Sequence, residues 1–65
     1  MVKNRLKEIR LKEYMMSSKE FSKILGIKLT TYSQWENGNT VPSLEKIFEV
    51  AKILNKEITE IWYSE

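Results

Sequence analysis

Residues 17–38, SSKEFSKILGIKLTTYSQWENG, hold the feature that most limits how this chain can fold: a glycine between two short amphipathic segments. Ser17 with Glu20 three positions later is the pattern of a capping box, so a helix is expected to begin there. Gly26 can adopt the left-handed conformation that ends a helix. Tyr32 and Trp35 then lie on one face of a second helix. The segment therefore predicts a helix-turn-helix.

A first helix is expected before this unit. Val2, Leu6 and Ile9 recur at helical spacing, which predicts a helix over about Lys3–Glu13. Tyr14–Met16 is an apolar patch, and we expect it to form a turn that tucks back onto the core.

A loop and two further helices are expected after the unit. The run ENGNTVPS has loop composition, and Pro42 disfavours helix at the residue before it. Ser43 can cap a fourth helix that stops near Asn55, with an apolar stripe of Leu44, Ile47, Phe48, Ala51 and Leu54. A last short helix contains Ile58, Ile61 and Trp62. The prediction is an all-α fold, a compact domain of five helices over residues 1–65.

Composition narrows the function classes. The chain of 65 residues has no Cys, His or Asp, so thiol chemistry, zinc ligation and a histidine base are absent, and we expect no enzyme, cofactor or metal. No apolar run approaches the ~18 residues of a membrane span, and no signal-peptide core follows the N-terminus, which predicts a soluble cytoplasmic protein without an evident small-molecule ligand.

Charge is unevenly distributed along the chain. Up to Gly38 there are eight Lys or Arg against four Glu, and beyond it three Lys against five Glu. The part that contains the predicted helix-turn-helix therefore has a net charge of +4 and the remainder −2. A helix-turn-helix can place its second helix in the major groove, and this asymmetry would attract phosphate to the same side.

With these elements placed, the chain resembles the phage repressor and Cro-like helix-turn-helix family, also known as the xenobiotic response element family. The resemblance rests on NRLKEIR, SSKEFSKILGI, the W-E-N-G end of the third helix, PSLEKIFEVAKIL and a terminal I-x-x-I-W, in that order. It implies a lambda-repressor-like fold and a DNA-binding transcriptional regulator of bacterial or phage type, usually dimeric on inverted-repeat operators.

The resemblance also implies which residues meet the bases. Leu29, Thr30, Ser33 and Gln34 fall at or beside the positions where the third helix contacts base edges. Gln34 offers the donor and acceptor that read adenine, and Thr30 can bond a base and touch a thymine methyl. Leu29 departs from the commonly polar choice there, and either a thymine methyl or the edge of the core explains it.

Phosphate contacts are expected around this helix. Backbone N–H groups at the start of the second helix and loop residues after the third can hold the DNA backbone, and the expected residues are Ser17, Ser18, Lys19, Lys23, Lys28, Asn37, Asn39 and Thr40. Further charge contacts are expected from Lys12 and Arg10. Capping, turn formation or solvation would explain each of these residues without DNA.

Two interactions within the protein are predicted. The resemblance implies that Arg10 faces Glu36, which would form an internal ion pair. Phe48 is expected in the core with Phe21, Tyr32 and Trp35.

A homodimer is expected on Ile58, Ile61, Trp62 and Tyr63, because exposed aromatics favour interfaces, although Trp62 could instead fold inward.

Two functions follow from the sequence. The first is a sequence-specific DNA-binding regulator, a repressor in our reading, with double-stranded DNA as partner. The alternative is a protein-interaction module, such as an antitoxin that neutralises a partner protein. Binding to duplex DNA separates the two.

Overall fold

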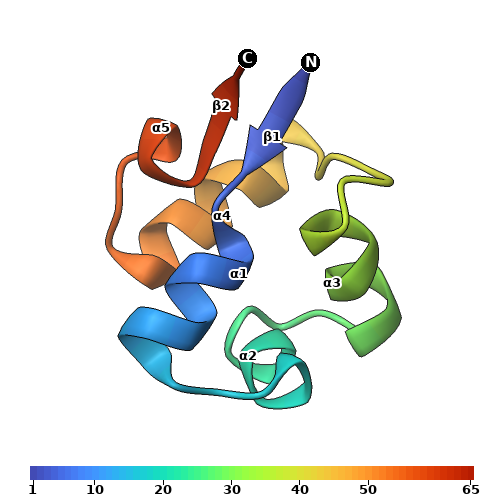
Figure 1. Cartoon of the computed structure of the whole chain (residues 1–65), viewed down its shortest axis with the longest axis vertical. Coiled ribbons are helices and arrows are strands. Elements are labelled where there is room, and N and C mark those ends of the chain that lie inside the picture. The colour runs from blue at the N-terminus through green and yellow to red at the C-terminus, as the bar shows by residue number, and fades with distance from the viewer.

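Five helices and a two-stranded sheet form this protein, and the computed structural model describes all 65 residues (Figure 1). α1 continues without a break into a π-helical turn, η1, so the two make one helix. In chain order the elements are β1 (Val2–Asn4), α1 (Leu6–Ile9), η1 (Arg10–Tyr14), α2 (Ser18–Ile24), α3 (Leu29–Glu36), α4 (Leu44–Leu54), α5 (Ile58–Ile61) and β2 (Trp62–Ser64). No helix combines the length and the apolar content that crossing a bilayer requires.

The sheet joins the two ends of the chain, so the all-α class was wrong in this respect. β1 and β2 run antiparallel, with Val2 opposite Ser64 and Asn4 opposite Trp62. Figure 1 shows both termini at the same edge of the domain. The first helix consequently begins at Leu6 rather than near Lys3, because the residues before it are extended.

The predicted helix-turn-helix is present with the expected boundaries. The Ser17 hydroxyl oxygen accepts from the Glu20 N–H at 3.2 Å, and the Ser17 N–H donates to Glu20 Oε1 at 3.0 Å, so the capping box is confirmed. Gly26 has φ +70°, and the Ile27 N–H donates to the Ser22 carbonyl at 3.1 Å. This closure satisfies the last carbonyls of α2 and lets α3 start only a few residues later.

The core is built around one chain of aromatic rings. Tyr14, Phe21 and Tyr32 stack edge to face, with ring centroids 5.2 Å and 5.5 Å apart, and thereby connect η1, α2 and α3. The buried apolar residues are Leu6, Ile9, Phe21, Leu25, Tyr32, Trp35, Val50, Ala51, Leu54, Ile61 and Trp62. Tyr14 and Met16 pack against this cluster as expected, whereas Met15 is exposed and does not tuck back.

The predicted stripe of α4 is wrong on one flank. The helix begins after the Ser43 cap and ends at Asn55, as expected. Its buried side, however, is centred on Val50 and Leu54, while Leu44 and Phe48 are exposed. Apolar residues surround most of this helix, so periodicity alone did not decide which flank faces the core.

The residues expected at the dimer surface are mostly buried within the single chain. Ile61 is fully buried and Trp62 is 6% exposed, so both belong to the core of the single chain. Ile58 and Tyr63 are half-buried. Trp62 therefore folds inward, which the sequence had left open, and it offers little surface to a second copy.

Candidate nucleic-acid interface

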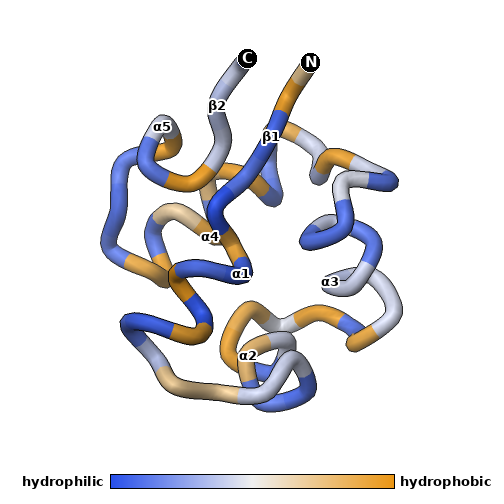
Figure 2. The backbone as a smooth tube through the Cα atoms, viewed as in Figure 1, coloured by the Kyte–Doolittle hydropathy of each residue, from blue (hydrophilic) through white to orange (hydrophobic).

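One face of α3 is polar and accessible. At about 100° per residue, Thr30, Gln34 and Asn37 fall on one side of the helix, opposite Trp35. Thr30, Gln34 and Asn37 are exposed and Ser33 is half-buried. Figure 2 shows the tube of α3 pale to blue along most of its length, with orange only near its start. Leu29, at that start, is exposed, so it projects from the same end as the predicted base contacts.

The opposite face holds α3 in the domain. Tyr32 is fully buried and Trp35 nearly so. The Asn4 side-chain N–H group donates to the Trp35 carbonyl at 2.8 Å, while the Asn4 Oδ1 accepts from the Leu6 N–H at 3.1 Å. Asn4 thus connects the end of α3 to the start of α1. We did not predict this role; an asparagine just before a helix was the one available signal.

A buried ion pair provides a second connection from α3 to the first helix. Arg10 Nε lies 3.2 Å from Glu36 Oε2, and Arg10 Nη2 lies 3.3 Å from Glu36 Oε1. The Arg10 Nη1 also donates to the Met16 carbonyl at 3.0 Å, and the Tyr32 hydroxyl donates to Glu36 Oε2. The predicted pairing of Arg10 with Glu36 is therefore confirmed, and it is bidentate.

The pKa values in this cluster follow from the same contacts. The bond to Glu36 raises the pKa of Arg10 above its usual range, despite the burial that opposes its charge. Burial and the Glu36 carboxylate both raise the pKa of Tyr32. The Tyr32 hydroxyl consequently stays protonated and keeps donating to Glu36. Arg10 is held inside the domain, so the expectation that it contacts phosphate was wrong.

Three lysines are free to meet an anion beside α3. Lys19 and Lys23 lie on α2, and Lys28 directly precedes α3; all three are exposed and form no ion pair. These were among the predicted phosphate contacts. Two of them lie on α2 and one at the N-cap of α3, so unpaired positive charge lies on the predicted unit.

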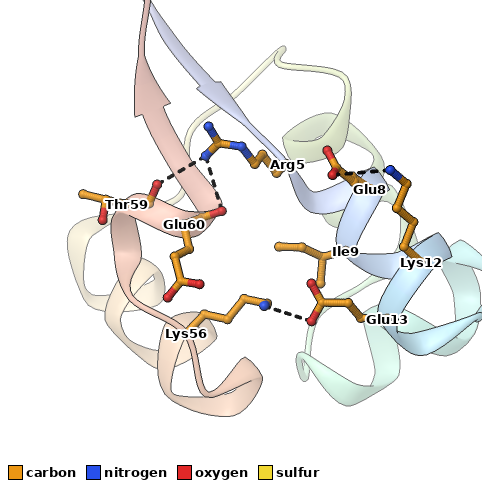
Figure 3. Close-up of a pocket in the computed structure, with 8 residues that line it drawn as sticks. All are labelled: Arg5, Glu8, Ile9, Lys12, Glu13, Lys56, Thr59 and Glu60. Carbon is orange, nitrogen blue, oxygen red and sulfur yellow. Dashed lines mark hydrogen bonds and ion pairs between the residues drawn. The ribbon is translucent and has the colours of Figure 1, made fainter.

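Lys12 lies elsewhere, in a charged hollow between the first helix and α5 (Figure 3). Its amine is 3.6 Å from Glu8, and across the hollow Lys56 is 2.9 Å from Glu13. Arg5 donates to the Thr59 and Glu60 carbonyls at 3.3 Å and 3.4 Å. Each cation here already has an oxygen partner. Figure 1 shows α5 and α3 on opposite sides of the domain, so Lys12 does not share the surface of α3.

The loop after α3 folds against the end of that helix. Gly38 has φ +80°, and the N–H groups of Asn39 and Thr40 both donate to the Gln34 carbonyl, at 2.9 Å and 3.3 Å. Asn37, Asn39 and Thr40 have exposed side chains next to Gln34 in the fold. At the start of α2, Ser17 is exposed and Ser18 half-buried.

The remaining predicted contact residues lie on α2, on α3 or in the loops next to them, and most of their side chains are exposed. No group of three or more acidic, His or Cys side chains is arranged to hold a metal ion. The structure presents amides, hydroxyls and ammonium groups instead. These groups bond base edges and phosphate oxygens.

Comparison with known proteins identifies the family of the chain. The Helix-turn-helix family model matches residues 6–61. The chain belongs to this family. It is also 31% identical, over 61 residues, to a protein of Archaeoglobus fulgidus described as an uncharacterized HTH-type transcriptional regulator; the match covers 94% of this chain and 84% of that protein. The matched range runs from the first residue of α1 to the last of α5.

Proposed function

We propose that this helix-turn-helix protein is a sequence-specific regulator of transcription, and that it represses by occupying an operator. The observation that carries the proposal is the division of α3 into a polar exposed face and a buried face held by Asn4 and Arg10. A helix fixed on one side and accessible on the other is suited to the major groove. The similarity to a transcriptional regulator supports the same function. A lambda-repressor-like mode of docking is part of this proposal.

Base reading is assigned to the exposed side of α3. Gln34 is exposed at mid-helix, where its amide can bond an adenine edge bidentately. Thr30, one turn earlier, can bond a base and touch a thymine methyl. Leu29 is exposed enough to contact a methyl group as well, and Ser33 flanks these positions.

The backbone contacts are assigned to residues that surround α3. Lys19, Lys23 and Lys28 supply unpaired charge, and hydroxyl or amide groups come from Ser17, Ser18, Asn37, Asn39 and Thr40. Such contacts set the register on the duplex without reading sequence. If each of the three lysines neutralises one phosphate and so releases its condensed counterions, the slope of log affinity against log salt should be about −3 for each bound copy.

We further propose that two copies bind one inverted-repeat operator. Equivalent helices in adjacent major grooves are separated by about 34 Å, so each would lie about 17 Å from the two-fold axis. The domain measures 27 × 22 × 20 Å, and this distance is shorter than each of its extents. Two domains in contact can therefore reach both half-sites.

Selection of bound sites from random duplex DNA tests the function. The selected site should bind about 1,000-fold more tightly than a scrambled duplex of equal length. Each titration is repeated at several salt concentrations to separate charge contacts from base reading. Equal affinity for selected and scrambled duplexes at moderate salt would exclude sequence-specific regulation and favour a protein-interaction module.

A further inference from the structure

The exposed flank of α4 carries apolar side chains that the fold does not use. Leu44 is 67% exposed and Phe48 56% exposed, and they are neighbours one turn apart. Val41, just before the helix, is 51% exposed. We refer to Val41, Leu44 and Phe48 as the α4 patch. Single exposed apolar residues are common, whereas Leu44 and Phe48 share one flank of the same helix and leave that flank without a partner in the chain.

The charges beside the α4 patch identify its partner. Glu45 and Lys52 are both exposed, and neither forms an ion pair within the chain, whereas Lys46 and Glu49 pair with each other at 3.9 Å. Glu45 and Lys52 are seven residues apart, which is about two helical turns, so both lie on the side of the helix that carries Phe48. They have opposite signs and lie on either side of Phe48, Glu45 three residues before it and Lys52 four residues after it.

From this arrangement we infer that the α4 patch binds the same patch of a second copy, with the two α4 helices antiparallel across a two-fold axis near Phe48. In that register Glu45 of each copy faces Lys52 of the other, which makes two identical ion pairs on either side of the Phe48 rings. A two-fold interface requires such self-complementarity. A surface meant for an unrelated partner has no need of this symmetry.

The size of the surface sets the strength of the association. The three side chains of the α4 patch can bury at most a few hundred Å² of accessible surface, which is below the ~800 Å² per partner of a standard stable interface. The pairing is therefore weak in solution and becomes effective when both copies bind adjacent half-sites, because the DNA raises their effective concentration. This inference rests on the proposed function, since it gives that function its cooperativity.

The test compares binding to one half-site with binding to two. Wild-type protein is titrated by fluorescence anisotropy on a duplex with a single half-site and on the full inverted repeat. We expect binding to the second half-site to be favoured by about 10-fold or more over independent binding. Phe48→Glu should abolish that factor and leave single-site affinity unchanged. Ile53→Glu is the matched control on the other flank of α4, where Ile53 is 44% exposed, and it should leave both quantities unchanged.

Charge reversal tests the antiparallel register. Glu45→Lys and Lys52→Glu should each lower the cooperative factor, because each sets like charges opposite one another. The double variant E45K/K52E should recover it, and so should an equimolar mixture of the two single variants, in which the unlike copies pair correctly. Circular dichroism is used to check that each variant is folded.

The possible outcomes are distinct. Loss with Phe48→Glu and recovery in both the double variant and the mixture would support the inference. Single-site binding without any cooperativity in wild type, or cooperativity unchanged by Phe48→Glu, would overturn it and leave the DNA-binding function standing. A complete absence of single-site specificity would instead refute the proposed function.

Discussion

Replacement of Glu36 by Gln should destabilise the domain far more than replacement of a surface carboxylate. The Arg10 and Glu36 side chains are only 11% and 12% exposed, and Glu36 accepts from two guanidinium nitrogens and from the Tyr32 hydroxyl. Glutamine keeps the shape but removes the charge, and its amide N–H group would face the donors of Arg10. The guanidinium would then keep one bond to the glutamine oxygen and one to the Met16 carbonyl, and it would lose the second bond and the opposite charge of the carboxylate.

The size of the effect follows from this burial. Removing one partner of a buried ion pair costs about 3–5 kcal/mol, and because a tenth of each side chain meets water we expect about 2–4 kcal/mol here. A domain of 65 residues has a total stability of about 3–10 kcal/mol. At about 4–8 °C per kcal/mol, the melting temperature should fall by roughly 8–30 °C.

Thermal and urea unfolding followed by circular dichroism measure this difference. Glu8→Gln is the matched control, because Glu8 pairs with Lys12 at 3.6 Å with both side chains largely exposed, and its removal should change stability by about 0.5 kcal/mol or less. A double-mutant cycle with Arg10→Gln then isolates the coupling of the pair. If Glu36→Gln unfolded at the same midpoint as wild type, the pair would have no role in holding α3.

Three further predictions concern stability. Met15 is exposed and has φ 51°, a backbone conformation that glycine adopts without strain. Met15→Gly should therefore raise the free energy of unfolding, measured with urea, by about 1 kcal/mol. A decrease would show that the Met15 side chain stabilises the fold. Because the pKa of Tyr32 is raised in the folded protein, the unfolded chain loses this proton at a lower pH than the folded one. The free energy of unfolding should therefore fall as pH rises above about 10, and the difference in that free energy between wild type and Tyr32→Phe should shrink over the same range. A difference that stays constant would contradict the raised pKa of Tyr32. Ser17→Ala should cost about 1 kcal/mol through loss of the α2 cap, whereas Ser18→Ala, the control, should change little; equal losses would argue against the capping role.

Much of the fold was predictable because its signals are local. Ser17 with Glu20, Gly26 and Ser43 each act within a few residues of their own position, and the structure places helix ends at all of them. The pairing of Arg10 with Glu36 spans 26 residues, and it was found through the family resemblance rather than through any local pattern.

The remaining features depend on contacts between distant residues. β1 and β2 are three residues each and join positions about 60 apart, so no alternation long enough to detect exists. Which flank of α4 faces the core depends on how the helix packs, and Leu44 and Val50 are equally apolar in sequence. The burial of Trp62 follows from the sheet that places it, and the role of Asn4 follows from the same strand pairing.

In the proposed function, the exposed face of α3 reads base sequence while the nearby lysines bind phosphate. The most direct test is the affinity of wild type, Gln34→Ala and Lys23→Ala for the selected site and for a scrambled duplex, each over a series of salt concentrations. Gln34→Ala should lose about 1–3 kcal/mol of binding free energy on the selected site, with little change on the scrambled duplex and an unchanged salt slope. Lys23→Ala should weaken both and reduce the slope by about 1. Equal weakening of both duplexes by Gln34→Ala would contradict base reading by α3, because Gln34 would then position the protein without reading the sequence.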